Sequence, residues 1–302
     1  MAMRAAARLA LSLTILAPAG ALALDNDPAL RGFGRFTRGV GGSPGTLVVD
    51  QAGFDSYVRE LGMAMAPTLL GPAETLGLNG FMFSIVEYSA TNVDEGADYW
   101  TRATEGTLQA SEAFEADPET AAEPEPPSFL HTFHVRMRKG LPYSFEVGAS
   151  VSYLLDSELW AFGGELKWSP NESVPELPVD FGLRVAANRT LGSVDLDLTT
   201  LTTDLVLSRG AGLGGVVNLT PYMAYSPLFI YARSNVVDAT PGFDESTDIN
   251  DVNSAFVLDR ADPVVHRFVL GARLVGSVVS FTPEVALAKG VQTYNLSFGL
   301  EF

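Results

Sequence analysis

The sequence predicts an all-β fold, a transmembrane antiparallel up-and-down β-barrel of about ten strands, with twelve as the alternative, after an N-terminal segment outside the barrel. Three observations predict this class. Apolar residues alternate with small or polar ones in repeated runs from residue 80 onward. Turn residues separate these runs, since the 302 residues include 29 Gly and 18 Pro. The runs are closer to eleven residues, the length that a tilted strand needs to cross a bilayer, than to the five or six of an average soluble strand.

The composition excludes several other classes of protein. The chain has no cysteine, which excludes disulfide scaffolds, thiolate metal sites and cysteine nucleophiles. With 36 acidic residues against 19 Lys and Arg, the formal net charge is -17, so a nucleic-acid partner is not expected. We also expect no cofactor and no resident metal.

Residues 1–24 have the features of a secretory signal peptide. Arg4 and Arg8 precede an apolar run, and Ala21-Leu22-Ala23 supplies a small-residue cleavage site. We therefore predict an exported protein with three parts: a signal peptide (1–24), an N-terminal extension or plug (25–79) and the barrel (80–302).

Residues 25–79 do not alternate. The spacing of Phe54, Tyr57, Val58 and Leu61 predicts a helix instead. The apolar residues that follow it need cover, which a barrel lumen would provide. Two interpretations stay open, a periplasmic extension and an internal plug.

Ten runs are predicted as barrel strands. They are residues 80–91, 128–139, 144–155, 159–169, 179–190, 193–208, 214–234, 264–276, 278–289 and 292–302. An even number returns the C-terminus to the side on which the chain entered. The connections 92–127 and 235–263 are the longest and carry most of the acidic excess, so we expect them outside.

One face of each predicted strand is apolar and should meet lipid, while the other face is polar and should line the lumen. Apparent breaks in the alternation at Thr200-Leu201 and at Tyr225–Leu228 are interpreted as β-bulges or strand ends. The predicted lumen-lining residues, candidates for pore selectivity, are His134, Arg136, Arg138, Glu146, Glu165, Lys167, Asp180, Arg184, Asp195, Asp197, Asp204, Arg267, Arg273 and Glu284.

The last run alternates to the final residue, with Tyr294, Leu296, Phe298, Leu300 and Phe302 on one face. In this the chain resembles the Gram-negative outer-membrane β-barrel proteins, although the upstream glycine of many such terminal strands is absent. The resemblance covers about residues 80–302 and identifies no subfamily. It implies that the terminal strand is the assembly signal read by the barrel assembly machinery. It also implies outer-membrane lipid and lipopolysaccharide as partners.

Three functions follow as hypotheses. The first is passive passage of a small or hydrophobic solute through a porin-like lumen. The second is a non-conducting structural or surface-interaction barrel that uses its acidic loops, where Asp244, Glu245, Asp248 and Asp251 are candidate ligands for divalent cations. The third is a lipid-modifying or proteolytic enzyme centred on His134. No catalytic site is predicted, because a lone inward histidine is more often structural.

Overall fold

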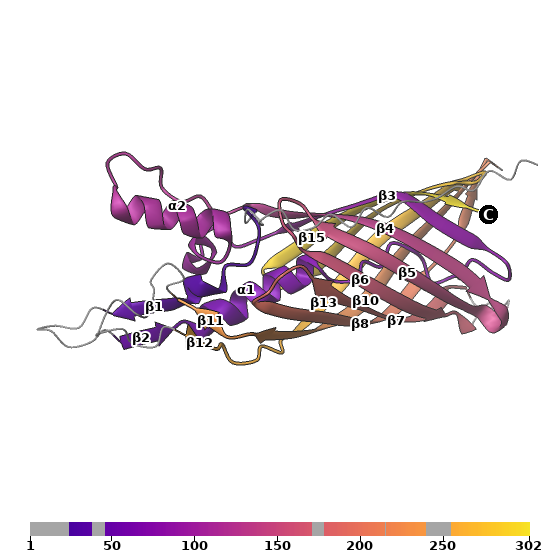
Figure 1. Ribbon diagram of the computed structural model, residues 1–302. Helices are drawn as coiled ribbons and strands as arrows, with labels where there is room; N and C mark the ends of the chain where they lie inside the picture. The colour runs from indigo at the N-terminus through magenta and orange to yellow at the C-terminus, as the bar shows by residue number, and fades with distance from the viewer. Residues whose placement is uncertain (1–23, 38–45, 171–177, 215, 240–254) are drawn as a thin grey trace, which may run out of the picture.

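The computed structural model describes residues 24–37, 46–170, 178–214, 216–239 and 255–302. Figure 1 shows an elongated barrel with a smaller helical part at one end. The signal peptide lies outside the described residues except for Leu24, and so do the four acidic loop residues Asp244, Glu245, Asp248 and Asp251. No helix among the described residues is long and apolar enough to cross a membrane.

The prediction of an antiparallel β-barrel is confirmed, and ten strands form it. They are β3 (Phe81–Asn92), β4 (Phe129–Leu141), β5 (Phe145–Leu154), β6 (Trp160–Trp168), β7 (Asp180–Leu191), β8 (Leu196–Ser208), β10 (Val217–Ser234), β13 (Val264–Gly276), β14 (Val279–Ala288) and β15 (Val291–Glu301). Each pairs with the next, and the β15–β3 and β10–β13 ladders complete the ring. A short strand β9 (Ala211–Leu213) folds back on β10. Because the sheet closes on itself, the ring of ten strands has no open edge.

The two ends of the barrel differ. Short connections such as Pro142–Ser144 lie together with the C-terminus at one end, which we call the turn end (Figure 1). There the Phe81 backbone N–H donates to the Phe302 carbonyl at 2.9 Å. The long connections lie at the opposite end, the loop end, where the structure describes residues 93–128, 235–239 and 255–263.

The N-terminal segment begins at the loop end. A 3-10 helix η1 (Leu30–Phe33) leads to the two-stranded sheet of β1 (Gly34–Thr37) and β2 (Thr46–Val49), and helix α1 (Gln51–Ala64) follows. The hairpin on which a twelve-strand barrel would depend therefore exists, but it stays outside the ring. The predicted helix is present, and the Asp50 carboxylate begins it by accepting the Gly53 N–H at 3.0 Å.

Four further elements join this N-terminal part. They are η2 (Asp98–Thr101) and α2 (Glu105–Ala116) from the first long connection, and β11 (Val237–Asp238) and β12 (Ala255–Phe256) from the second. Together with η1, β1, β2 and α1 they form what we call the cap. The composition of residues 112–127, which is rich in Pro, Ala and Glu, predicts disorder, but helix α2 extends into the start of this stretch as far as Ala116.

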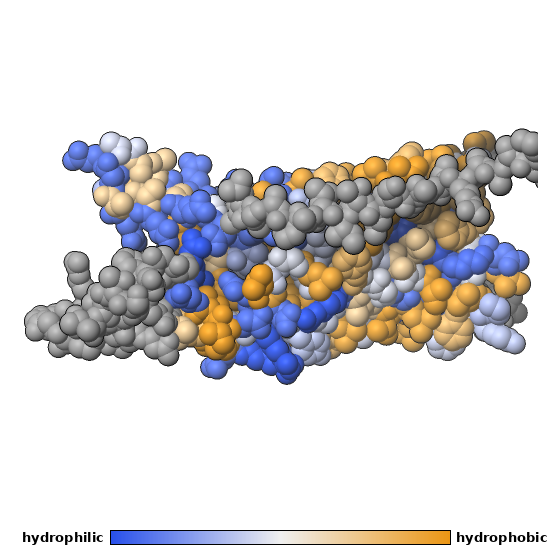
Figure 2. Space-filling model, viewed as in Figure 1, coloured by the Kyte–Doolittle hydropathy of each residue, from blue (hydrophilic) through white to orange (hydrophobic). Residues whose placement is uncertain are grey.

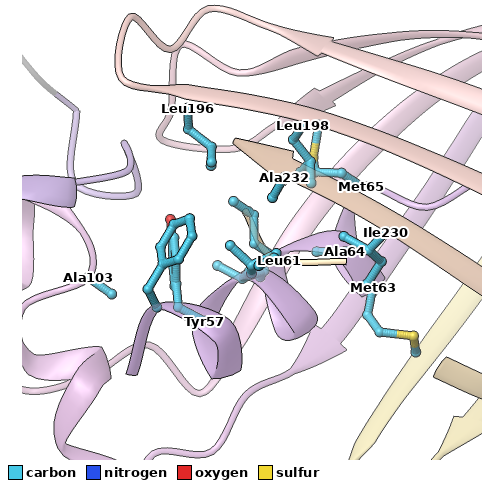
Figure 3. Close-up of a cluster of buried hydrophobic side chains, with 14 of the residues drawn as sticks. Tyr57, Leu61, Met63, Ala64, Met65, Ala103, Leu196, Leu198, Ile230 and Ala232 are labelled. Carbon is cyan, nitrogen blue, oxygen red and sulfur yellow. The ribbon is translucent and has the colours of Figure 1, made fainter. Parts of the chain in front are cut away.

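Helix α1 sits in the mouth of the barrel at the loop end. Figure 3 shows Tyr57 and Leu61 of α1 together with Leu196 and Leu198 of β8 and Ile230 of β10. All five side chains are at most 4% exposed. The inner face of the wall is therefore apolar at the loop end, where it packs on the helix, and charged nearer the turn end. Burial of this apolar surface fixes the cap to the barrel.

Candidate functional site

The interior of the barrel contains a second part of the N-terminal segment. Residues 65–80, which we call the lumen segment, run from the end of α1 to the start of β3 at the turn end. The Met65 carbonyl accepts a hydrogen bond from Asn188 Nδ2 at 3.0 Å near the loop end. The Leu76 N–H donates to Glu146 at 2.9 Å near the turn end. The segment thus passes along the length of the barrel.

Most of the predicted lumen-lining residues project inward. Ten of them are almost fully enclosed, namely His134, Arg136, Arg138, Glu146, Glu165, Lys167, Arg184, Asp204, Arg267 and Glu284. Asp180 and Arg273 lie on the inner face at the turn end and are less buried, and Arg273 pairs with Glu301 at 2.6 Å.

Two predicted lumen residues do not face the lumen. Asp197 lies on the outer face of β8 and pairs with Arg189 at 2.5 Å, both side chains being about half exposed. Asp195 lies before β8, in the connection from β7. The prediction assigned these residues to the inner face because it assumed a break in the alternation of the strand. In the structure, β8 alternates without interruption and has no bulge at Thr200 or Leu201. β10 likewise has no bulge at Tyr225–Leu228. Leucines occupy the inner positions here because they pack on α1.

The inward charges form an ion-pair network on the wall. Glu165 lies 2.5 Å from Arg138 Nε and 2.6 Å from Arg184 Nη2, and Arg184 Nη1 lies 2.5 Å from Asp204. Nearer the turn end, Lys167 pairs with Glu146 at 3.0 Å. Each of these six charges is buried together with an opposite charge, which is the condition under which buried ions are tolerated.

Glu87 belongs to this network, although the alternation did not indicate it. Its carboxylate is fully buried and lies 3.3 Å from Arg136. The register of β3 shifts between Phe83 and Glu87, so that Ile85 and Val86 both face outward. This bulge moves Glu87 to the inner face, and two adjacent apolar residues are the one sequence signal that could have revealed it.

The arginines of the network also bind the backbone of the lumen segment. Arg136 Nη1 and Arg184 Nη2 donate to the Thr68 carbonyl at 3.0 and 2.7 Å. Arg138 Nη1 donates to the Leu70 carbonyl at 3.0 Å. Charged donors to a neutral carbonyl make strong hydrogen bonds in a site that excludes water.

Polar groups of the wall also bind the segment elsewhere along its length. Lys167 Nζ donates to the Glu74 carbonyl at 2.8 Å, the Leu70 N–H donates to Glu284 at 2.6 Å, and the Ala73 N–H donates to Ser208 Oγ at 3.1 Å. These contacts use main-chain groups of the segment. No side-chain motif in the sequence could therefore have indicated them.

A cavity beside the first part of the segment is small. A cavity between Pro67 to Leu69 and the wall residues Ser226, Arg267 and Glu284 measures about 10 Å³. That volume holds about one water molecule. The close approach is also visible at Gly182, where a Cβ atom would lie 2.7 Å from the Ala73 carbonyl oxygen.

His134 is enclosed by hydroxyl groups. Its Nδ1 lies 2.7 Å from Ser152 Oγ, and its Nε2 lies 3.1 Å from both Ser89 Oγ and Thr132 Oγ1. The ring is 3% exposed. These neighbours satisfy both ring nitrogens.

A buried carboxylate organises the cap. Glu60 of α1 accepts hydrogen bonds from Trp100 Nε1 at 2.6 Å and from the Tyr99 hydroxyl at 2.8 Å. Burial, and then the negative charge of Glu60, raise the pKa of Tyr99, so its hydroxyl stays protonated and keeps donating. Glu60 thereby joins α1 to η2.

The predicted assembly residues line the outer face of β15. Tyr294, Leu296 and Phe298 are 48%, 46% and 43% exposed, respectively. Phe302 stacks on Phe81 with ring centroids 6.4 Å apart, where the last strand meets the first.

No protein-family model matches this chain, and no curated protein matches it. Among solved structures it is similar to Ail, the attachment invasion locus protein of Yersinia pestis, with 11% identity over 74% of this chain and 99% of that chain and a TM-score of 0.30. It is also similar to a mutant of the Rh. blastica porin, with 6% identity over 75% of this chain and 99% of that chain and a TM-score of 0.18. Neither similarity assigns a subfamily or a function.

Proposed function

We propose that the protein is a barrel of the Gram-negative outer membrane whose lumen is closed by the lumen segment. The barrel would anchor the cap and display it at the cell surface. The outer face of the wall supports a membrane location, because it exposes side chains such as Val135, Leu183 and Phe268. Outer-membrane barrels have short periplasmic turns and long external loops. With that orientation, the turn end faces the periplasm and the cap faces outward.

One observation carries the proposal of a closed barrel. Arg136, Arg138 and Arg184 hold the carbonyls of the lumen segment inside the ring. Release of the segment would exchange these charge-assisted hydrogen bonds for hydrogen bonds to water, and each such bond contributes about 1.5–3 kcal/mol to stability. Passive transport of a solute, the alternative function, requires such a release.

The cap offers a surface for interaction. A groove of about 320 Å³ lies between η1 and α2, lined by Arg31, Arg102, Leu108 and Phe114 among others. Arg31 pairs with Glu105 at 2.8 Å, so the groove combines charged and apolar groups. Binding sites for small molecules are concave and combine apolar side chains with a few polar groups. Divalent cations at the acidic loops and lipopolysaccharide remain part of this proposal, as does insertion by the barrel assembly machinery.

A catalytic role for His134 has less support. Its partners among the described residues are three hydroxyl groups, and none of these partners is the acidic orienting group of a catalytic triad. We propose that His134 is a structural residue and that the protein is not an enzyme.

Conductance in a planar lipid bilayer tests the closed state. The purified mature chain should give no conductance steps. The comparison is the variant Ala73→Cys with Ser208→Cys, whose disulfide would lock the segment to the wall, measured before and after reduction. Both states should be silent. Steps from the unmodified chain that the disulfide abolishes would contradict the proposal and establish a channel gated by the segment.

A further inference from the structure

The outer face of the barrel carries charge at one place near the cap. Along this face of the ten strands, the charged residues that the structure describes are Lys139 at the turn end and Arg189, Asp197 and Arg233 at the loop end. Charge on a lipid-facing surface is costly near the middle of a bilayer and much less so at its interface. Three such residues on the neighbouring strands β7, β8 and β10 therefore indicate that this part of the outer face lies at the membrane interface.

The strand register brings this group together. Arg189 of β7 is paired with Thr199 of β8, and Thr199 is paired with Tyr231 of β10. Two residues nearer the loop end, and on the same outer face, Asp197 of β8 is paired with Arg233 of β10. We call this group, together with Arg260, the arginine cluster. It surrounds a depression of about 360 Å³.

The arginines differ in how they are neutralised. Arg189 pairs with Asp197 at 2.5 Å, and Arg260 pairs with Asp262 at 2.6 Å while its guanidinium lies 5.6 Å from the centre of the Tyr231 ring. Arg233 has no ion-pair partner in the part of the chain that the structure describes. Three guanidinium groups and two carboxylates leave one positive charge, although the chain as a whole carries -17.

The surroundings indicate the depth of the cluster in the membrane. Arg189 is paired with Phe162 of β6, and Trp160, two residues earlier, is 46% exposed. Aromatic side chains of this kind lie at the level of the lipid headgroups. Figure 2 shows hydrophobic side chains over the wall and hydrophilic ones gathered toward the cap. Arg189, Asp197 and Arg233 each lie within two residues of the loop end of their strand.

Apolar side chains continue the same surface towards the turn end. Leu183 and Val185 of β7 and Leu205 of β8 are 43%, 49% and 40% exposed. A molecule with phosphate groups and acyl chains would meet both parts at once, its phosphate at the guanidinium groups and its chains along these residues. Guanidinium groups bind phosphate through paired N–H donors.

We propose that the arginine cluster is a binding site for the phosphorylated glycolipid of the outer leaflet, with Arg233 as its principal phosphate ligand. The site depends on the proposed function in one respect, that the loop end faces outward. It does not depend on closure of the lumen, which conductance tests separately.

Binding of diphosphorylated lipid A to the folded mature protein in detergent, measured by native mass spectrometry, tests this site. Arg233→Gln should weaken binding about fivefold, the effect of one arginine at a lipid surface. Replacement of Arg189, Arg233 and Arg260 together by Gln should weaken it further. The control is Lys139→Gln, an outward cation at the turn end, which should leave binding unchanged. Because these side chains are exposed, the variants should keep the heat-modifiable mobility of the folded barrel.

Two further probes separate the lipid from its phosphate. Lipid A without phosphates should bind the unmodified protein only as weakly as the triple variant binds the phosphorylated form. Inorganic pyrophosphate at the concentration of the lipid should not displace it, because the acyl chains contribute to binding. Equal binding of lipid A by the unmodified protein and the triple variant would overturn the site. Displacement by pyrophosphate would overturn the assignment of a lipid.

Discussion

The network that holds the lumen segment should be far more sensitive to substitution than ion pairs on the outer wall. Arg184 donates to Glu165, Asp204 and the Thr68 carbonyl, and its side chain is 2% exposed. In Arg184→Met, Asp204 would lose this ion pair, and its Oδ1 already has no hydrogen-bond partner among the described residues. Removal of one partner of a buried pair costs about 3–5 kcal/mol. We expect that loss in the free energy of unfolding.

The same strand provides a matched control. Arg189, five residues after Arg184 on β7, pairs with Asp197 on the exposed outer face. Arg189→Met should therefore cost less than about 1 kcal/mol. Urea unfolding of the protein in lipid vesicles, followed by the fluorescence of its three tryptophans, measures both.

A second substitution identifies the cause of the loss. Asp204→Asn in the Arg184→Met background removes the unpaired carboxylate, so part of the stability should return. Equal losses for the inner and the outer arginine would refute the network. So would a further loss on adding Asp204→Asn.

Three further predictions concern the segment, the cap and the terminal strand. Gly182→Leu should lower the unfolding midpoint strongly, because the new side chain would overlap the lumen segment. The control Gly164→Leu should change the midpoint little, because Gly164 faces outward and the nearest atom lies 3.8 Å from the position of a Cβ. Equal shifts of the midpoint would contradict the path of the segment. Glu60→Ala should expose Trp100 to acrylamide quenching, because it removes the acceptor of the indole N–H, and unchanged quenching would show that Glu60 does not organise the cap. Replacement of Phe298 and Phe302 by Ala should lower outer-membrane insertion severalfold in membrane fractions, and normal levels would count against a terminal assembly signal.

Much of the fold could be predicted because a closed sheet repeats one simple rule. Each strand must present apolar residues to lipid and hide the others, and the alternation records this directly. The predicted ends of most strands therefore lie within a few residues of those observed, and the helix of residues 51–64 was indicated by its own spacing. The rule fails where the inner face of the barrel is not polar. At the loop end the inner face is apolar because α1 fills the mouth, so Asp197 was placed inside when it lies outside.

The contents of the lumen could not be predicted for a different reason. The wall recognises main-chain carbonyls and N–H groups of residues 65–76, and any sequence carries those groups. The inward arginines were visible, yet nothing in the alternation distinguishes arginines that line a water path from arginines that bind a segment of the chain. Glu87 was missed because a bulge changes the phase within a single strand.

Disulfide formation in intact cells tests most directly whether the lumen segment occupies the barrel. The chain has no cysteine, so Ala73→Cys with Ser208→Cys introduces a single defined pair at a point where the Ala73 N–H lies 3.1 Å from Ser208 Oγ. Mild oxidation should link the pair completely and shift its mobility on a denaturing gel until reduction. The control, Ala73→Cys with Ser89→Cys, places the second thiol near His134 and should not link. Failure of the first pair to link in folded protein, or equal linking of both pairs, would contradict the account.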